Sequence, residues 1–544
     1  MRKINFLLAG IATLFMASCS NDEPANNNGG ENVKNGTESY LAIKIVNPTD
    51  SRKAGEGYLD GEGNETKINK LEFYLFNEDG SAFKLYDPDT KAAIGNRVTP
   101  KDAIGDPTKP GEENNIESVY NPLLVFTHKA GELPASIVAI ANGPDLFNGA
   151  QNPSIGETEL KAKFDAYGTG FIMSNAMISG GKFTAISPDN LSTSADEAKK
   201  NPIIINIERV VARIDVNLQN GANNNGLYPI AGATIDNGKA LYAKLEGWAL
   251  HNEAAKSYLL KNVAFTTTPT WTWSGTDRSF WANTDKLSTE TGAFVANNNK
   301  WNNITNGDGT KVYTQENTLD DTPTTLVVKA SIGTFSDNTF TPVTVAQWKG
   351  GVRYAGEDAL KTAMVNYLKE QSQESRVYIK KDDNTFETIP ANAIKFEVKN
   401  PNAAADNYQV VAKLNTTAYP EVYKVTGTGE ATNATLLTET QANTLFENVL
   451  GTALIWGNST TAGMTYYSFP IQHNITEAPA GTTGIVRNHV YQIKIKSVGG
   501  LGTPVYNPDQ VIIPEEVEFE EASMFAEIRV LSWRVVTNDV DLGK

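Results

Sequence analysis

Cys19 is the only cysteine in the 544-residue chain, and its surroundings indicate that its thiol carries a lipid. A thiol used in catalysis or metal binding would need a histidine or a second cysteine nearby, and the sequence has neither there. The positively charged Arg2 and Lys3 precede a short apolar stretch, which is typical of a secretory signal and too short to span a bilayer. The stretch ends in a lipobox, with Met16 where leucine is commoner. We therefore predict a signal peptide over 1–18 and diacylglycerol on Cys19; an incidental cysteine is the alternative.

The dibasic pair Arg52-Lys53 is a second position where chemistry is expected, because a trypsin-like protease cuts after either residue. The pair precedes Ala54 in a loop rich in glycine and aspartate. Just before this loop, apolar residues recur at every second position and predict a strand with one apolar face: Leu41, Ile43 and Ile45. A cut would free this strand to leave its sheet, so residues 19–53 are interpreted as a lipidated tether and propeptide strand.

The end of the chain, from about residue 525 to 544, carries a similar apolar pattern. Its apolar positions are Ile528, Val530, Trp533, Val536, Val540 and Leu542. A vacated groove would expose unpaired backbone groups, and such a terminal strand from another copy could fill it. About four buried side chains at ~1.5–3 kcal/mol each would contribute on the order of 6–12 kcal/mol before ordering costs.

A head-to-tail contact of this kind need not close on itself and can therefore build a filament. The alternative is that Arg52-Lys53 is an ordinary solvated loop. In that case both terminal strands pair within their own domains.

Residue patterns typical of enzymes and metal sites were not found. The four histidines are far apart in sequence and lack zinc-site spacing, so we interpret them as structural or surface residues: His128, His251, His473 and His489. Nucleophile-elbow, metalloprotease and phosphate-loop motifs are absent. A carboxylate pair in a cleft, as in glycosidases, stays open. We predict no catalytic residue, no metal and no cofactor.

One aromatic group suggests binding. Trp271 and Trp273 alternate, so on a strand both rings would lie on one face and could stack against a sugar. The alternative, which we favour, is that they seal one end of a core.

The net charge of −16 and pI near 4.9 argue against nucleic-acid binding, which needs a basic surface. Such acidity suits a soluble extracellular body tethered by lipid.

Strand patterns dominate the rest of the chain. Short runs rich in valine, isoleucine, threonine and tyrosine recur between Gly, Asn, Asp and Pro turns, as in β-sandwiches. Apolar spacing predicts helices only at 157–167, 357–370 and 440–450, which we interpret as decorations of a sheet. The asparagine-rich break at 220–225 predicts the boundary between domains 54–220 and 221–544. The predicted fold class is all-β with short helical insertions.

Several motifs resemble those of the Bacteroidetes fimbrillins that build type V pili, and the resemblance is strongest to the minor-fimbrium shaft subunit. They include KINKLEFYLFNEDG (67–80), ERVVARIDV (208–216) and RNHVYQIKIKSVGGLGTP (487–504), the last being the most specific. The terminal pattern Ile528-x-Val530-x-x-Trp533 is similar to the family's last strand. The acidic residues after Cys19 resemble an export signal for the outer face of the outer membrane. The segment from about 285 to 440 does not align.

The resemblance implies two tandem transthyretin-like β-sandwich domains. It further implies lipidation at Cys19, trimming by an Arg/Lys-specific protease at Arg52, Lys53 and Ala54, and polymerisation by donor-strand exchange. The partners would be other copies of the chain, accessory pilus subunits, the maturation protease, and a host or bacterial surface ligand. The alternatives are a tip adhesin, an anchor, or a monomeric surface lipoprotein that binds glycan or host protein.

Overall fold

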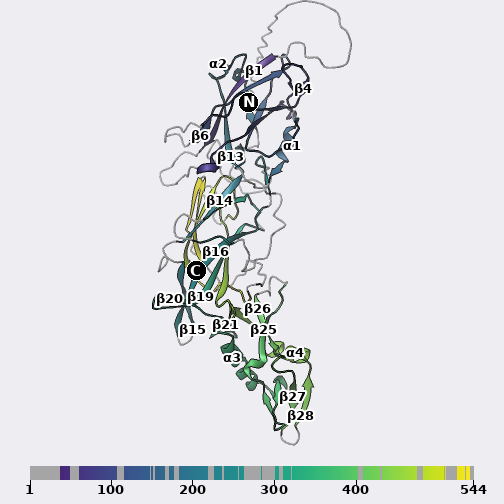
Figure 1. The fold of residues 1–544 in the computed structure, drawn as a ribbon, viewed down its shortest axis with the longest axis vertical. Coiled ribbons are helices and arrows are strands. Elements are labelled where there is room, and N and C mark those ends of the chain that lie inside the picture. The colour runs from purple at the N-terminus through teal and green to yellow at the C-terminus, as the bar shows by residue number, and fades with distance from the viewer. Residues whose placement is uncertain are drawn as a thin grey trace, which may run out of the picture.

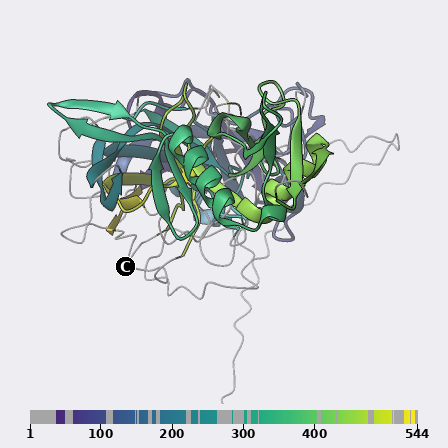
Figure 2. The ribbon, with the colours of Figure 1, turned by 90° about the horizontal axis from the view of Figure 1, so that it is seen from below.

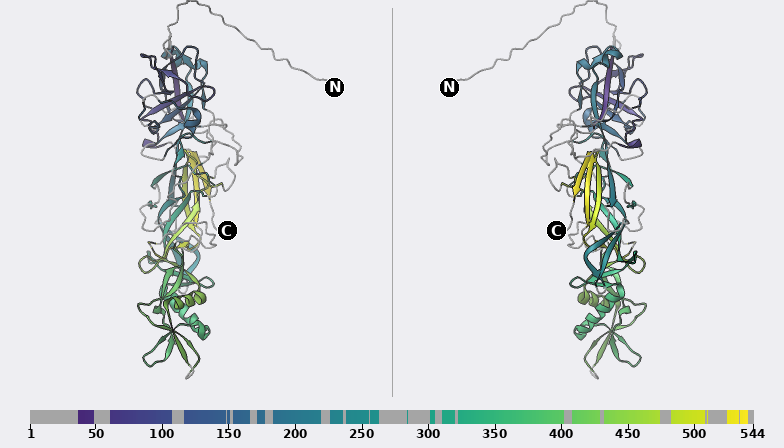
Figure 3. Two further views of the ribbon diagram at one scale, coloured as in Figure 1. Left: turned by 90° about the vertical axis from the view of Figure 1, so that its right-hand side faces the viewer. Right: turned by 90° about the vertical axis from the view of Figure 1, so that its left-hand side faces the viewer.

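The computed structural model describes residues 37–48, 61–106, 116–147, 149–150, 153–165, 171–176, 183–218, 226–235, 238–254, 256–262, 284, 301–304, 310–319, 322–401, 408–428, 432–473, 482–507, 509, 524–532 and 534–539. Over these residues the molecule is elongated, and three groups of strands follow one another along its long axis (Figure 1). The first group contains β1, the second lies in the middle, and the third, with two helices, lies at the opposite end (Figure 3).

The first unit is a twelve-stranded arrangement around one apolar core. Its main path is β4 (Ala93–Ile94), β3 (Leu85–Tyr86), β7 (Leu123–His128), β1 (Thr37–Pro48), β13 (Ile203–Arg209), β10 (Met173–Asn175), β8 (Ser136–Ala141), β2 (Leu71–Phe76) and β5 (Arg97–Val98). At its sides, β11 (Thr184–Ala185) pairs with β8, while β6 (Ile116–Tyr120) and β12 (Leu191–Ser192) pair with β1. All six residues of β2 are buried because apolar clusters cover both of its faces.

The second unit is an eleven-stranded arrangement with its own core. Its main path is β18 (Lys311–Gln315), β14 (Val211–Leu218), β31 (Val490–Val498), β15 (Leu227–Ile235), β16 (Lys239–His251), β19 (Thr325–Ser336), β30 (Met464–Pro470) and β32 (Thr503–Pro504). Strand β20 (Thr339–Pro342) pairs with β19, and β33 (Met524–Ser532) and β34 (Arg534–Asp539) pair with β31. In β16, the buried Leu241, Ala243 and Leu245 alternate with less buried residues, as a strand with one face toward a core should.

The third unit lies within residues 345–456 and combines two small sheets with two helices. One sheet is β22 (Val352–Ala355), β21 (Val345–Trp348), β29 (Thr452–Trp456), β26 (Gln409–Leu414) and β25 (Ile394–Val398). The other is β24 (Phe386–Thr388), β23 (Tyr378–Lys380), β27 (Val422–Thr426) and β28 (Asn433–Leu437). Helices α3 (Glu357–Glu370) and α4 (Glu439–Leu450) pack with them, and Figure 2 shows this end of the molecule in a view along the long axis.

The predicted helices at 357–370 and 440–450 are confirmed, the second beginning one residue earlier than predicted. A capping box between Thr438 and Gln441 starts α4, and Gly451, with a φ of 68°, ends it. The interpretation of these helices as decorations was wrong, because they enclose a third core with the two small sheets. The first predicted helix is shorter than expected: α1 spans Glu157–Lys161, and β9 (Phe164–Asp165) follows and pairs with β17 (Ser257–Tyr258).

The all-β class with few short helices is confirmed. The change from the first unit to the second falls at Val210, between β13 and β14, whereas the sequence placed the boundary after residue 220. The asparagine-rich break marks only the far end of β14, because the change of sheet falls at a single residue, Val210, inside a run of strand residues. Among the described residues, none of the helices has the length and apolar character needed to cross a membrane.

Candidate functional site

Strand β1, which contains the predicted propeptide strand, is paired along both of its edges. Its first half, Thr37 to Ala42, lies antiparallel to β7, and Tyr40 and Leu41 also pair with β12. Its second half lies parallel to β13 from Ile43 onward and antiparallel to β6. β1 therefore passes from one group of strands to another and joins them, and it has partner strands on both edges at Tyr40, Leu41, Ile45 and Val46.

The apolar face of β1 is buried in the core of the first unit. Leu41 and Ile45 are 0% exposed and Ile43 is 1% exposed, and all three belong to one core cluster. Burying three such side chains contributes roughly 5–9 kcal/mol. Loss of β1 would therefore leave a long apolar groove with backbone hydrogen-bonding groups on both sides.

The residues predicted as the proteolytic site, Arg52, Lys53 and Ala54, lie outside the described residues. β1 ends at Pro48 and the description resumes at Gly61. Cys19, Trp271 and Trp273 also lie outside the described residues, as do Trp533, Val540 and Leu542 at the end of the chain.

The carboxyl-terminal segment forms a hairpin on the second unit of its own chain. Strand β33 lies antiparallel to β31, with Ile528 opposite Ile493 and Val530 opposite Tyr491, and β34, which contains Val536, folds back on β33. Figure 3 shows this yellow hairpin along one side of the middle unit. Both terminal strands of this chain therefore pair within their own units, which is the arrangement expected if Arg52-Lys53 is an ordinary loop.

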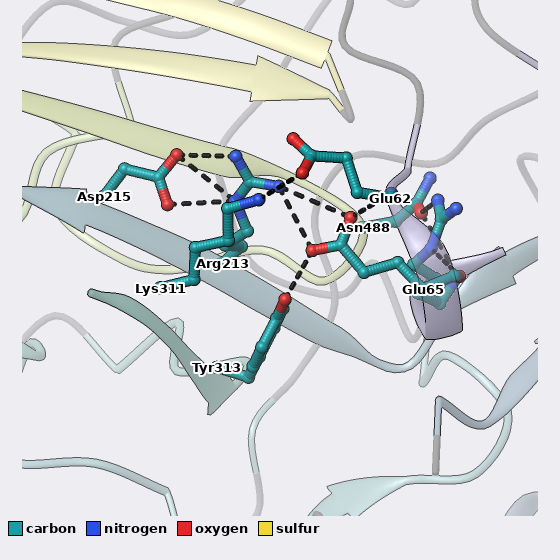
Figure 4. Close-up of polar contacts among 8 residues, drawn as sticks. Glu62, Glu65, Arg213, Asp215, Lys311, Tyr313 and Asn488 are labelled. Carbon is teal, nitrogen blue, oxygen red and sulfur yellow. Dashed lines mark hydrogen bonds and ion pairs between the residues drawn. The ribbon is translucent and has the colours of Figure 1, made fainter. Parts of the chain in front are cut away.

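A buried group of charged residues joins the first unit to the second just after the undescribed segment (Figure 4). Glu65 ends the 3-10 turn η1 (Gly63–Glu65) and is 2% exposed. Its carboxylate accepts hydrogen bonds from the Tyr313 hydroxyl, from Arg213 Nη1 at 3.1 Å, and from the Glu62 N–H at 2.7 Å. Arg213 in turn donates to Asp215 at 2.7 and 2.9 Å. The guanidinium thus lies between two carboxylates.

Backbone groups take part in the same junction. Arg209 Nε donates to the carbonyl of Glu65 at 2.7 Å, and Arg209 Nη1 donates to Asn488 Oδ1 at 3.3 Å. Nearer the surface, Lys311 Nζ and Glu62 Oε2 are 2.7 Å apart. Among the partners of η1, Arg209 comes from β13 of the first unit, whereas the others come from β14 and β18 of the second unit. Residues 62–65 are therefore attached to the second unit by side chains and not by a strand ladder.

The Glu65 carboxylate is held in its charged form. Burial by itself would raise the pKa of Glu65, but the hydrogen bonds from Tyr313 and the Glu62 N–H, with the charges of Arg213 and Arg209, lower that pKa below its ordinary value.

A second buried ionic group lies at the same boundary. Lys261 Nζ is 2.9 Å from Glu208 Oε1, and Arg487 Nε donates to Glu316 Oε2 at 3.0 Å. Arg487 also donates to the carbonyl of Tyr258 at 2.7 Å. Burial lowers the pKa of Lys261, and Glu208 opposes this effect. These buried charges are paired, as buried charges need to be.

Sequence reasoning missed this junction, although its residues lie in motifs it had quoted. Glu208, Arg213 and Asp215 all lie in ERVVARIDV (208–216), and Arg487 begins RNHVYQ. The available signal was the presence of charged residues inside otherwise apolar strand runs. A strand of this kind is often buried on both faces, and a charge in it then needs a partner of opposite charge.

The histidines are all buried: His128, His251, His473 and His489. The structure brings two of them together, with the rings of His473 and His489 5.1 Å apart. His473 Nδ1 is hydrogen-bonded to the Tyr491 hydroxyl at 2.8 Å, and that oxygen accepts the Val486 N–H at 2.7 Å. Within the described part of the chain, no group of three or more His, Cys, Asp or Glu residues could hold a metal ion.

Two family models match the chain at the ends that these sites occupy. A model described as Major fimbrial subunit protein (FimA) matches residues 39–211, and one described as Major fimbrial subunit protein type IV, Fimbrillin, C-terminal, matches residues 459–539. The first match begins in β1 and ends where the sheets change, and the second contains β31 and the terminal hairpin. The chain is a fimbrillin.

Solved structures similar to this fimbrillin have low sequence identity. A candidate cell adhesion protein from Parabacteroides distasonis ATCC 8503 is 14% identical, with 93% of this chain and 98% of that chain covered and a TM-score of 0.35. One from Bacteroides eggerthii DSM 20697 is 12% identical, with the same coverage and a TM-score of 0.34. The tip fimbrial protein Mfa3 from Porphyromonas gingivalis, truncated at its C-terminus, is 10% identical, with 91% of this chain and 100% of that chain covered and a TM-score of 0.31. These scores are below 0.5, so the assignment rests on the family models. No curated protein matches the chain.

As a fimbrillin, the protein is a structural subunit of a cell-surface pilus and is not an enzyme. Its partners are other copies of itself and accessory pilus subunits. The third unit lies outside both matched ranges.

Proposed function

We propose that this fimbrillin is the shaft subunit of its pilus and polymerises by donor-strand exchange. The chain is exported as a lipoprotein through Cys19, and an Arg/Lys-specific protease cuts it near Arg52 and Lys53. β1 then leaves the first unit, and the terminal segment of another copy takes its place. The resulting pilus serves adhesion and colonisation.

The pairing of β1 is the observation that supports this proposal most. An interior strand with the buried Leu41, Ile43 and Ile45 cannot be lost without replacement, because its neighbours would expose both apolar surface and backbone groups. Only a strand of similar apolar pattern satisfies such a groove. Residues 528–542 supply that pattern.

The terminal hairpin can detach at lower cost than β1. β33 lies at the end of the chain on β31, which keeps its parallel pairing with β14 whether or not the hairpin is present. Detachment of the hairpin therefore breaks pairing with β31 alone, while departure of β1 breaks pairing with β7, β13, β6 and β12. This difference favours detachment of the terminal segment without a prior replacement, whereas β1 leaves only after proteolysis.

The decisive experiment starts from purified protein that begins near residue 20. Treatment with a trypsin-like protease should give SDS-resistant ladders, because exchanged strands exchange back slowly. Changing Arg52 and Lys53 to Ala, or truncating after Phe525, should abolish the ladders. Ladders that persist in the truncated protein would refute the assignment of the tail as donor.

A second candidate function is that of a terminal, adhesive subunit. The third unit, with its own core at the end away from β1, is placed as an added binding module would be (Figure 1). A synthetic peptide of residues 524–544 separates the two functions. The groove of a shaft subunit, once trimmed and tail-less, must bind its own tail peptide. A terminal subunit has no such requirement, and failure to bind would favour it.

A further inference from the structure

Residues 61–70 lie between the proposed maturation site and β2 and contain two exposed lysines, Lys67 and Lys70. They are the first basic residues after Lys53. A protease that selects Arg and Lys would therefore meet them next. Their exposed side chains alone would make both positions further cleavage sites.

The backbone around these lysines is fixed by one side chain of the first unit. Asn142 Nδ2 donates to the carbonyl of Lys67 at 2.7 Å, and Asn142 Oδ1 accepts the N–H of Asn69 at 2.8 Å and of Lys70 at 3.3 Å. The Asn142 N–H donates to the carbonyl of Lys70 at 2.8 Å. The side chain of Ile68, directly after Lys67, is buried in the core of the first unit.

On its other side Lys67 follows the junction formed by Glu65. The Glu65 carboxylate is held by Arg213 and Tyr313, and the carbonyl of Thr66 accepts the Tyr120 hydroxyl at 3.1 Å. Figure 4 shows how the side chains of the second unit converge on η1. The peptide bond after Lys67 thus lies between two anchors.

We propose that Glu65 and Asn142 form a proteolytic stop, which confines the maturation protease to the Arg52-Lys53 loop and so fixes where the mature chain begins. A protease must draw several residues around the scissile bond into its cleft in extended form. Cleavage of a hydrogen-bonded segment therefore requires local opening and follows the population of the open state. This proposal extends the proposed function and depends on it in one respect only, namely that cleavage begins at Arg52 or Lys53.

The test uses the full chain from near residue 20, a trypsin-like protease, and N-terminal sequencing with intact mass over time. Within residues 52–71, the wild type should gain a new N-terminus only at Lys53 or Ala54. Glu65→Ala should be cut after Lys67 at least tenfold faster than the wild type, giving a product that begins at Ile68. Glu62→Gln, an exposed neighbour in the same turn, is the matched control and should behave as the wild type.

Two further variants keep the proposal open to refutation if Glu65→Ala folds poorly. Asn142→Gly removes the other anchor while tolerating the φ of 53° at that position, and it should also expose the bonds after Lys67 and Lys70. Lys67→Gln in the Glu65→Ala background should remove the product that begins at Ile68.

A folded Glu65→Ala or Asn142→Gly that is cut no faster after Lys67 would overturn the stop. Wild-type cleavage after Lys67 as fast as after Lys53 would do the same. A wild type that is cut at neither Arg52 nor Lys53 would instead overturn the proposed maturation, while the variants still report on Lys67.

Discussion

Strand β1, inside the first unit, and the junction at Glu65, between the first and second units, are both buried, but they are held in different ways. β1 is held by apolar side chains and a backbone ladder, neither of which depends on residue identity beyond shape and pattern. Glu65 is held by Arg213 and Tyr313 through charge and directed hydrogen bonds. An alternating apolar strand can be replaced by another, whereas a buried carboxylate between set partners cannot.

This difference agrees with the proposed cleavage and strand exchange. The part that is to be exchanged uses generic contacts, so that a second copy can reproduce them. The part that must survive the exchange uses specific ones, and it begins directly beyond the segment that would be cut. The comparison can be tested by perturbing each region in turn.

Arg213→Met should produce the largest loss of stability. It leaves Glu65 and Asp215 buried without their cation, and breaking a buried pair costs about 3–5 kcal/mol. Urea unfolding followed by fluorescence measures the loss. The same loss should appear in the uncut monomer and in the polymer, because the junction stays in both.

Lys311→Met is the matched control for this variant, since Lys311 lies on the same face of the junction but pairs with the exposed Glu62. An exposed pair is worth about 0–1 kcal/mol, so this change should be small. Equal effects of the two substitutions would contradict the view that Arg213 holds the junction.

Ile43→Ala should destabilise the uncut chain somewhat less, by about 2–5 kcal/mol, because it opens a cavity in the first core. Lys44→Ala, on the opposite face of β1, should stay within about 0.5 kcal/mol. In the polymer the Ile43 variant should be as stable as the wild type, because Ile43 departs with the propeptide. A penalty that persists in the polymer would show that β1 is never replaced.

The sequence predicted β1 well because Leu41, Ile43 and Ile45 repeat at period 2, which is a local signal. It did not show that β1 is an interior strand, because the partners at β6, β7, β12 and β13 are spread over the chain. The bounds of α3 were equally local, whereas its role in a third core depended on β21, β26 and β29, which no nearby pattern connects to it.

The junction at Glu65 was not predicted for a different reason. Arg213 and Asp215 lie in a predicted strand, but a single sequence does not reveal which charges meet across units. Glu65 lies in a loop where acidic residues are common. Only the tertiary arrangement brings these groups within hydrogen-bonding distance.

Acid should weaken the junction at Glu65 and leave the apolar contacts of β1 unchanged. This is the smallest of the expected effects. The pKa of Glu65 is lower in the folded chain than its ordinary value near 4.5, so its stabilisation is complete above that value and is lost as the pH falls below it. The charged groups around it are Glu62, Arg209, Arg213, Asp215 and Lys311, with Tyr313 as the neutral donor.

The urea midpoint of the wild type should therefore fall between about pH 5 and pH 3 by more than that of Glu65→Gln, whose amide does not titrate there. Ile43→Ala should shift in parallel with the wild type across this range, because no titrating group is removed. Parallel curves for the wild type and Glu65→Gln would mean that other carboxylates set the acid sensitivity, and the contrast between the two regions would then lose its electrostatic basis.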